Sequence, residues 1–195
     1  GVIGNQSINE LATLSFTATA TDSDLPADTL TFSLDAASLL LGMTIDANTG
    51  VFSWTPTEGD GGSIPSVTIT VTDSGTGNLI DSETFTITVN DVNVAPVLGA
   101  IGNQSINELA TLSFTATATD SDLPADTLTF SLDAASLLLG MSIDANTGVF
   151  SWTPTEGDGG SIPSVTITVT DSGTGNLIDS ETFTVTVNDV NVAPV

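Results

Sequence analysis

The segment Val67-Thr68-Ile69-Thr70-Val71 alternates strictly between apolar and hydroxyl-bearing side chains. Successive side chains of a β-strand point to opposite faces, so the segment predicts a strand with one buried face and one threonine-rich face. β-Branched residues also favour strands. The same alternation of period two runs along residues 14–20, 30–34, 52–54 and 85–89.

Turn signals separate these segments and set their lengths. Clusters of Gly, Pro, Asn, Asp and Ser fall at residues 22–26, 46–50, 59–62 and 74–78. With an edge strand over residues 3–10, the pattern amounts to about seven short strands, and only residues 36–41 could wind into one helical turn. We therefore predict an all-β, immunoglobulin-like sandwich, with core side chains that include Phe16, Met43 and Trp54.

The sequence consists of two nearly identical tandem repeats. Ile3 aligns with Ile101, and the match then continues to Val97 and Val195. Only three aligned pairs differ, all conservatively: Val2/Ala100, Thr44/Ser142 and Ile87/Val185. We therefore predict two tandem seven-stranded sandwiches, residues 1–97 and residues 98–195. The short, proline-bearing string at residues 90–97 should act as a stiff linker between them.

The charge of the chain excludes several functions. The sequence has 24 acidic residues and no Lys, Arg, His, Cys or Tyr, which gives a formal charge of −24. Nucleic-acid binding and attraction to an anionic membrane need cationic side chains. Serine–histidine, cysteine–histidine and Schiff-base catalysis each lack an essential group, as do zinc sites built on Cys and His. Its longest apolar stretch, residues 36–43, is too short for a membrane-spanning helix, so we expect no membrane insertion.

The acidic residues gather at strand ends, in loops and at the linker. Two carboxylates about 4 Å apart repel by roughly 4 kcal/mol at an effective dielectric constant near 20. A cluster therefore needs a cation, which this chain must take from solution. Oxygen-only ligands favour calcium over transition metals.

Several short motifs together resemble the cadherin repeat. They are Ala20-Thr21-Asp22-Ser23-Asp24 for A-x-D-x-D, Ile45-Asp46-Ala47-Asn48-Thr49-Gly50-Val51 for the I-D-x-x-T-G turn, Thr55-Pro56-Thr57-Glu58 at the L-D-R-E position, Val71-Thr72-Asp73 for A-x-D, and Asp91-Val92-Asn93-Val94-Ala95-Pro96 for the linker. In pattern, the sequence is most similar to the bacterial cadherin-like, or putative-Ig, tandem repeats of large secreted adhesins and surface proteins, which include the dystroglycan-type cadherin-like repeats. The resemblance covers nearly all of each unit.

This resemblance implies calcium at the junction between the repeats. The implied ligands are Glu10, Glu58, Asp91 and Asn93 from the first repeat and its linker, and Asp120, Asp122 and Asp171 from the second. Asp126, with Asp28 as its counterpart, is a candidate substitute ligand from the same loop. Pro56 and Val94 stand where the family has aspartates, so we expect one or two ions per junction instead of three. Each end of the chain would carry half of a further site: Asp22, Asp24 and Asp73 at one end, and Glu108, Glu156, Asp189 and Asn191 at the other.

The leading functional hypothesis is a non-catalytic, calcium-binding extender of a bacterial cell-surface or secreted adhesin. Its partners would be neighbouring repeats of a longer array, of which this chain is a fragment, or other copies of the chain. The alternative is a homotypic or carbohydrate-binding module, whose copies could join head-to-tail into filaments. Sugar platforms need exposed aromatic rings, whereas Trp54 and Trp152 are predicted to face inward. A third hypothesis is an enzyme that hydrolyses glycosides with Glu58 and Asp60 as its carboxylate pair. We do not favour this hypothesis and expect the chain to be non-catalytic.

Overall fold

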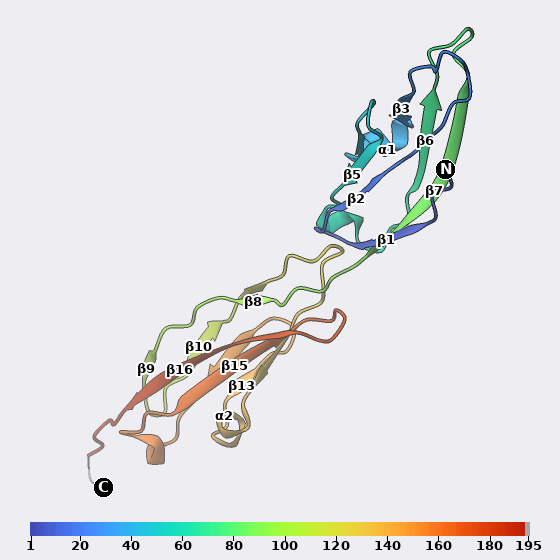
Figure 1. The fold of residues 1–195 in the computed structure, drawn as a ribbon. Helices are drawn as coiled ribbons and strands as arrows, with labels where there is room; N and C mark the ends of the chain where they lie inside the picture. Colours follow the sequence, from blue (N-terminus) through green and yellow to red (C-terminus); the bar gives the residue numbers. More distant parts are fainter. Residues whose placement is uncertain (194–195) are drawn as a thin grey trace. The chain divides into compact units, whose positions relative to one another are not determined.

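The computed structural model describes residues 1–193, which form two compact β units that divide between Val92 and Asn93 (Figure 1). Each unit is described by itself below. The domain boundary expected from the sequence, between residues 97 and 98, stays a prediction. Within residues 1–193, no helix is long and apolar enough to cross a membrane.

The first unit contains seven strands in two sheets. One sheet has the order β1-β7-β6-β3 and the other the order β2-β5-β4. The strands are β1 (Gln6–Asn9), β2 (Leu14–Thr17), β3 (Thr31–Leu34), β4 (Thr44–Ile45), β5 (Val51–Trp54), β6 (Ser66–Thr72) and β7 (Ile80–Asn90). Two short helices, α1 (Ala36–Leu40) and η1 (Glu58–Asp60), lie between strands. The alternating pattern predicted the larger strands but missed β4, which has only two residues.

The second unit repeats this arrangement and adds two short strands. The additions are β8 (Val97–Leu98) and β11 (Ala118–Thr119), which pair with each other antiparallel. Its sheets have the orders β12-β15-β16-β9 and β10-β14-β13. The repeated elements are β9 (Gln104–Asn107), β10 (Leu112–Thr115), β12 (Thr129–Leu132), α2 (Ala134–Leu138), β13 (Ser142–Ile143), β14 (Val149–Trp152), η2 (Glu156–Asp158), β15 (Ser164–Thr170) and β16 (Ile178–Asn188).

Sheet pairing is antiparallel except that β1 pairs with β7, and β9 with β16, in the parallel sense. In the first unit β1 runs parallel to β7, with Gln6 opposite Ile87 and Asn9 opposite Asn90. The long hairpin β6–β7 is antiparallel and places Ser66 opposite Thr86. β6 and β7 form the longest strand pair of the unit, so the loops that flank this hairpin lie at its two opposite ends.

The core of each unit is the layer between its two sheets. Met43 and Trp54 are 1% and 2% exposed, as the sequence analysis predicted. Phe16 is only partly buried, and its ring stacks on Phe52 at 4.8 Å between centroids. The Trp54 indole N–H donates to the carbonyl oxygen of Leu41 at 2.9 Å, which satisfies the one polar atom of that side chain. The prediction of an all-β fold with two sandwich-like domains is confirmed.

The helix α1 is tied to the sandwich by its capping residue. Asp35 accepts hydrogen bonds from the backbone N–H of Ser38 at 3.0 Å, from the Ser38 hydroxyl at 2.6 Å and from the N–H of Thr68 at 2.7 Å. Burial acts to raise the pKa of Asp35, but these hydrogen bonds together outweigh it and lower the pKa to about 2. Asp133 makes the same contacts in the second unit, and its pKa is also lowered.

Candidate metal centre

Acidic side chains collect at both ends of the long hairpin in each unit. We call one group the exit cluster, because it lies where the last strand leaves the unit. We call the other the entry cluster, because it lies in the loops at the opposite end of the hairpin. The exit clusters are Glu10, Glu58 and Asp91, and Glu108, Glu156 and Asp189; the entry clusters are Asp22, Asp24, Asp28 and Asp73, and Asp120, Asp122, Asp126 and Asp171.

The exit cluster is built around a buried glutamate. Glu10 follows β1, its backbone N–H donates to Asn90, and only 3% of its surface is exposed. One carboxylate oxygen, Oε1, accepts a hydrogen bond from the N–H of Val92 at 2.8 Å. The other, Oε2, is buried and has no hydrogen-bond partner among residues 1–193. The exit cluster therefore contains a carboxylate oxygen that is withdrawn from water and still lacks a proton donor.

A glycine makes room for this carboxylate. A Cβ atom at Gly61 would collide with Oε2 of Glu10 and would lie 2.9 Å from Oδ1 of Asp91. The two carboxylates therefore converge on one small residue. The sequence analysis included Gly61 only in the turn signal at residues 59–62 and did not connect it with Glu10 or Asp91.

The second unit repeats this geometry closely. Glu108 is 3% exposed, its Oε1 accepts from the N–H of Val190 at 2.8 Å, and its Oε2 has no partner within the described part of the chain. A Cβ at Gly159 would meet both Glu108 and Asp189. The third predicted ligand is less enclosed, since Glu58 is half-buried and Glu156 is exposed.

The entry cluster of the second unit brings three aspartates together. Asp120, Asp126 and Asp171 each offer one carboxylate oxygen, and these three oxygens lie within 4.8 Å of one another. Oδ2 of Asp120 is buried without a hydrogen-bond partner in residues 1–193. Asp171 is 4% exposed, and its Oδ1 accepts from the N–H groups of Gly173 and Leu177.

Two linker residues contact this cluster. The side-chain amide of Asn93 donates to Oδ2 of Asp171 at 3.1 Å and to the carbonyl oxygen of Thr174 at 3.2 Å. The N–H of Val94 donates to both carboxylate oxygens of Asp122, at 3.2 and 3.1 Å. Asn93 and Asp171, predicted from the sequence to share a site, are therefore adjacent within this unit.

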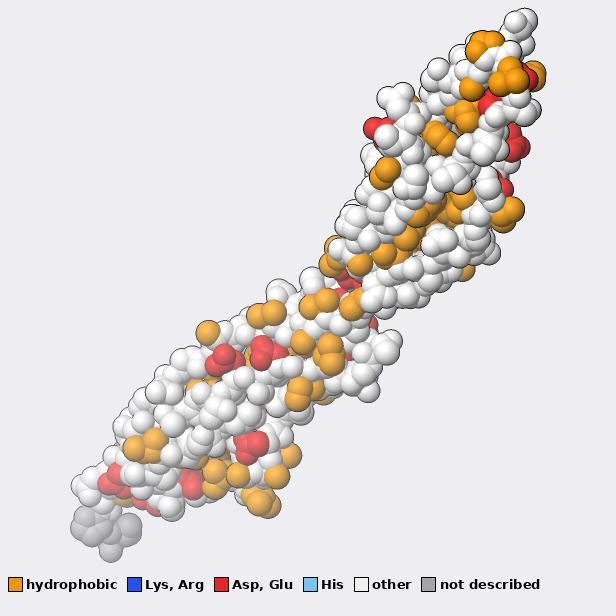
Figure 2. Space-filling view, viewed as in Figure 1, with side chains coloured by type: hydrophobic (Ala, Val, Ile, Leu, Met, Phe, Trp, Pro, Cys, Tyr) orange, Lys and Arg blue, Asp and Glu red, His pale blue; other side chains and the backbone are white. Residues whose placement is uncertain are grey.

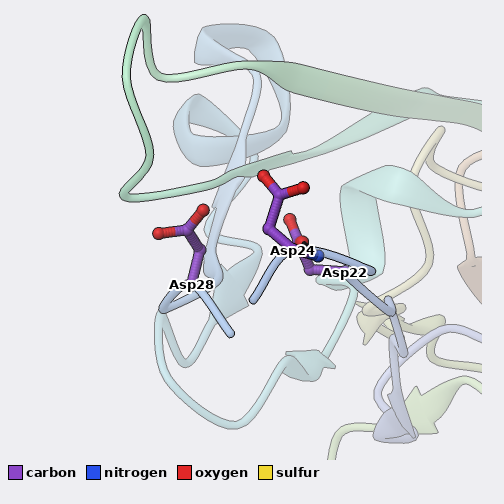
Figure 3. Close-up of side chains that lie close together, drawn as sticks. All are labelled: Asp22, Asp24 and Asp28. Carbon is purple, nitrogen blue, oxygen red and sulfur yellow. Dashed lines mark hydrogen bonds between the residues drawn. The ribbon is translucent and has the colours of Figure 1, made fainter. Parts of the chain in front are cut away.

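The entry cluster of the first unit has a different membership. Here Asp22, Asp24 and Asp28 offer the three oxygens that lie within 4.8 Å of one another (Figure 3). The Asp24 N–H donates to Oδ1 of Asp22 at 2.7 Å, so the loop turns back on itself. Asp73 lies outside this trio and accepts from the N–H groups of Gly75 and Leu79. Asp28 and Asp126, which the sequence offered only as substitute ligands, thus lie in the trio of each unit.

The chemistry of these groups suits a hard divalent cation. Every donor atom is an oxygen from a carboxylate, an amide or the backbone, and Figure 2 shows acidic but no basic side chains on the face it presents. A buried carboxylate without a compensating partner is costly, and a bound cation would remove that cost. The acidic groups could therefore hold metal ions.

The comparison with protein families covers most of the chain. A family model described as "Putative Ig domain" matches twice, over residues 2–90 and 95–188. No curated protein sequence matches the chain significantly.

Solved structures with a similar fold are cadherin fragments. The mouse cadherin-23 fragment EC22-24 is 23% identical, with a TM-score of 0.53, 97% of this chain covered and 63% of that one. The human CDH23 fragment EC21-23 is 19% identical, with a TM-score of 0.58 and coverages of 95% and 72%. Human protocadherin-24 EC1-2 is 21% identical, with a TM-score of 0.52 and 85% coverage of both chains. The chain thus spans less than two thirds of the length of the mouse fragment.

These matches agree with the sandwich topology and with the motif order in the sequence. Because these solved structures are only 19–23% identical to the chain, they support the fold alone. The chain belongs to the "Putative Ig domain" family and consists of two cadherin-like tandem repeats.

Proposed function

We propose that this chain is a calcium-binding extender segment of a bacterial cell-surface or secreted adhesin, with Ca²⁺ at the junctions between repeats. The observation that carries the proposal is the set of buried carboxylate oxygens that have no partner among the described residues: Oε2 of Glu10 and of Glu108, and Oδ2 of Asp120. The chain has no cationic side chain to pair with them. The counter-charge must therefore come from solution.

The proposed ligands are those that the family resemblance implies. Glu10, Glu58, Asp91 and Asn93 would serve from one repeat and its linker. Asp120, Asp122 and Asp171 would serve from the next repeat, with Asp126 added because it belongs to the same trio. The glycine at position 61 supports this assignment, since any side chain there would displace the Glu10 carboxylate. The oxygen-only ligand set favours Ca²⁺ over softer metals.

The mechanical role follows from where the ligands lie in the sequence. The ligand set includes residues before, within and after the linker, so an ion that binds them all ties two consecutive repeats together. The bound ion would fix the orientation of the repeats and turn a jointed chain into a stiff one. Extracellular calcium modules commonly bind at roughly 0.1–1 mM, which suits a protein that acquires its ions outside the cell.

Calorimetric titration of the chelated chain with Ca²⁺ tests the proposal, together with small-angle scattering in calcium and in EDTA. We expect saturable binding, and a scattering profile that changes when calcium is removed. The double variant Asp120→Asn with Asp122→Asn should lose at least one ion. The exposed residue Asp81 provides a control, since Asp81→Asn removes one carboxylate outside the proposed ligand set and should leave the stoichiometry unchanged. The same stoichiometry in the double variant would refute the ligand assignment, and an unchanged profile would refute the stiffening.

A further inference from the structure

Each repeat contains a single Asp–Gly pair, Asp60-Gly61 in the first and Asp158-Gly159 in the second. Every other aspartate of the chain is followed by a residue that carries a side chain. Glycine has no side chain to shield its nitrogen, and it allows the widest range of backbone conformations. In this sequence, the Asp–Gly pairs are therefore the places where a backbone nitrogen can most easily attack the carboxyl group of the residue before it.

This attack leads to isomerisation of the aspartate. A bond forms between the glycine nitrogen and Cγ of the aspartate, and one carboxyl oxygen leaves as water with the amide proton and a carboxyl proton. Water then opens the succinimide ring. If the bond from the nitrogen to Cγ breaks, aspartate is restored. If the original peptide bond breaks, the product is isoaspartate, whose main chain runs through Cβ and Cγ. The overall change neither adds nor removes atoms and needs no oxidant or reductant.

The folded chain holds the Asp60 carboxylate away from this reaction. The backbone N–H and the hydroxyl of Thr57 both donate to Oδ2 of Asp60, each at 2.7 Å. These bonds close the capping box of the short helix η1. They fix the carboxylate on the residue that begins the helix, whereas ring closure needs Cγ aligned with the nitrogen of the next residue.

The attacking nitrogen and the backbone beyond it are held as well. The Gly61 N–H donates to the carbonyl oxygen of Glu58 at 3.3 Å. The next N–H, of Gly62, donates to the carbonyl oxygen of Val89 in β7 at 3.0 Å. Both reacting groups are thus restrained, so ring closure requires a local opening of this loop.

The second unit restrains its carboxylate in the same way. The N–H and the hydroxyl of Thr155 donate to Oδ2 of Asp158 at 2.7 and 2.6 Å. The Gly160 N–H donates to the carbonyl oxygen of Val187 at 2.9 Å. The two units therefore provide matched copies of one restrained Asp–Gly pair.

Isomerisation would alter the exit cluster. Gly61 lies against Glu10 and Asp91, because a Cβ atom at this position would collide with Oε2 of Glu10 and would lie 2.9 Å from Oδ1 of Asp91. Isoaspartate at position 60 places one more carbon in the main chain directly before this glycine. Since there is no room even for a Cβ, the longer backbone must displace either the glycine or the two carboxylates.

We propose that Asp60-Gly61 and Asp158-Gly159 are sites of spontaneous aspartate isomerisation, and that the hydroxyl groups of Thr57 and Thr155 restrain the reaction in the folded chain. The two threonines act as positioning residues, since each holds the carboxylate that would react. The inference does not depend on calcium, so it is tested in EDTA, and its failure would leave the proposed function untouched.

Incubation of the full chain in EDTA, at neutral pH and below its unfolding temperature, tests the proposal. Isoaspartate is counted by enzymatic methylation and located by peptide mass spectrometry. In Thr57→Val, isoaspartate should form at position 60 roughly three to ten times faster than at position 158 of the same chain, because one hydrogen bond to the carboxylate is lost. The substitution changes the peptide mass, so the two sites can be distinguished. Equal rates at the two positions would overturn the proposal.

Matched variants separate the hydroxyl group from general stability. Thr57→Ser keeps the hydroxyl and should react at the rate of the unsubstituted chain, and Thr155→Val should transfer the effect to position 158. Asp35→Asn weakens the cap of α1 but leaves the Thr57 contacts in place, so it should not accelerate the reaction. Acceleration by Asp35→Asn equal to that by Thr57→Val would refute the positioning role.

Two further measurements test the site and its consequence. In urea, both positions should react faster than in the folded chain, and equal rates in the folded and unfolded chains would refute the restraint. In the isomerised fraction, the Val92 amide, which donates to Glu10, should exchange its hydrogen faster than in the unmodified chain. Unchanged exchange at Val92 would show that isomerisation does not reach the exit cluster.

Discussion

The two entry clusters have identical loop sequences but different surroundings. Asp122 and Asp171 are 7% and 4% exposed, whereas their counterparts Asp24 and Asp73 are exposed and half-buried. In the second unit, Asn93 and Val94 donate hydrogen bonds to Asp171 and Asp122. The loop sequence by itself therefore does not determine the environment of its carboxylates.

The two exit clusters, in contrast, have the same environment in both units. Glu10 and Glu108 have the same burial, the same hydrogen bond to the backbone and the same unpartnered oxygen. Each of these features arises from contacts within one repeat. The exit cluster is therefore complete in a single unit, while the entry cluster depends on the segment that precedes the unit.

The largest expected effect comes from truncating Leu98, the buried side chain of β8. Leu98→Ala should lower the unfolding free energy of the second unit by about 3 kcal/mol, because it deletes a buried side chain and leaves a cavity. Urea denaturation of chains with Trp54→Phe or Trp152→Phe reports each unit separately. The first unit should not change. Leu25→Ala, at a side chain that is 94% exposed, is the control, and equal loss in both units would contradict the comparison.

A smaller effect should be equal in the two units. Asp35→Asn and Asp133→Asn should each cost about 1–2 kcal/mol, because the caps of α1 and α2 make the same hydrogen bonds. The folded pKa of Asp35 is about 2, below the ordinary value of 3.8 for an aspartate. Its contribution is therefore present above about pH 4 and is lost as the pH falls toward 2. Acid titration of unfolding measures this loss, and a different loss in the two units would argue against local origin.

The smallest effect concerns the linker amide. Asn93→Ala should destabilise the second unit by about 1 kcal/mol, because it removes the hydrogen bonds to Asp171 and to the carbonyl of Thr174. Hydrogen exchange of the Gly173 amide, which donates to Asp171, measures the loosening of that loop. In the first unit, the Gly75 amide should exchange at the same rate in the variant as in the unsubstituted chain. No change at Gly173 would mean that Asn93 does not support the entry cluster.

The sequence was sufficient for the fold and for part of the candidate site. Period-two alternation predicted the long strands because one face of each is buried, and Trp54 and Met43 lie in the core as expected. The strands β4, β8 and β11 escaped prediction, since two residues carry no readable period. The order of the motifs implied Asn93 and Asp171 as ligands of one site, and a hydrogen bond joins these two side chains, whereas Asp126, a member of the trio, was implied only as a substitute ligand. The hydrogen bond from the Val94 N–H to Asp122 is a backbone contact that no residue type predicts.

The parallel pairing of β1 with β7 has a consequence for load bearing. These strands lie near the two points where a repeat in an array would be pulled, and Gln6 through Asn9 register against Ile87 through Asn90. Tension applied at the start of β1 and at the end of β7 would act along the strands and would strain their hydrogen bonds together, in shear, instead of opening them one at a time. Each repeat therefore has the geometry of a mechanical clamp, with the buried Glu10 immediately beyond its last residue pair.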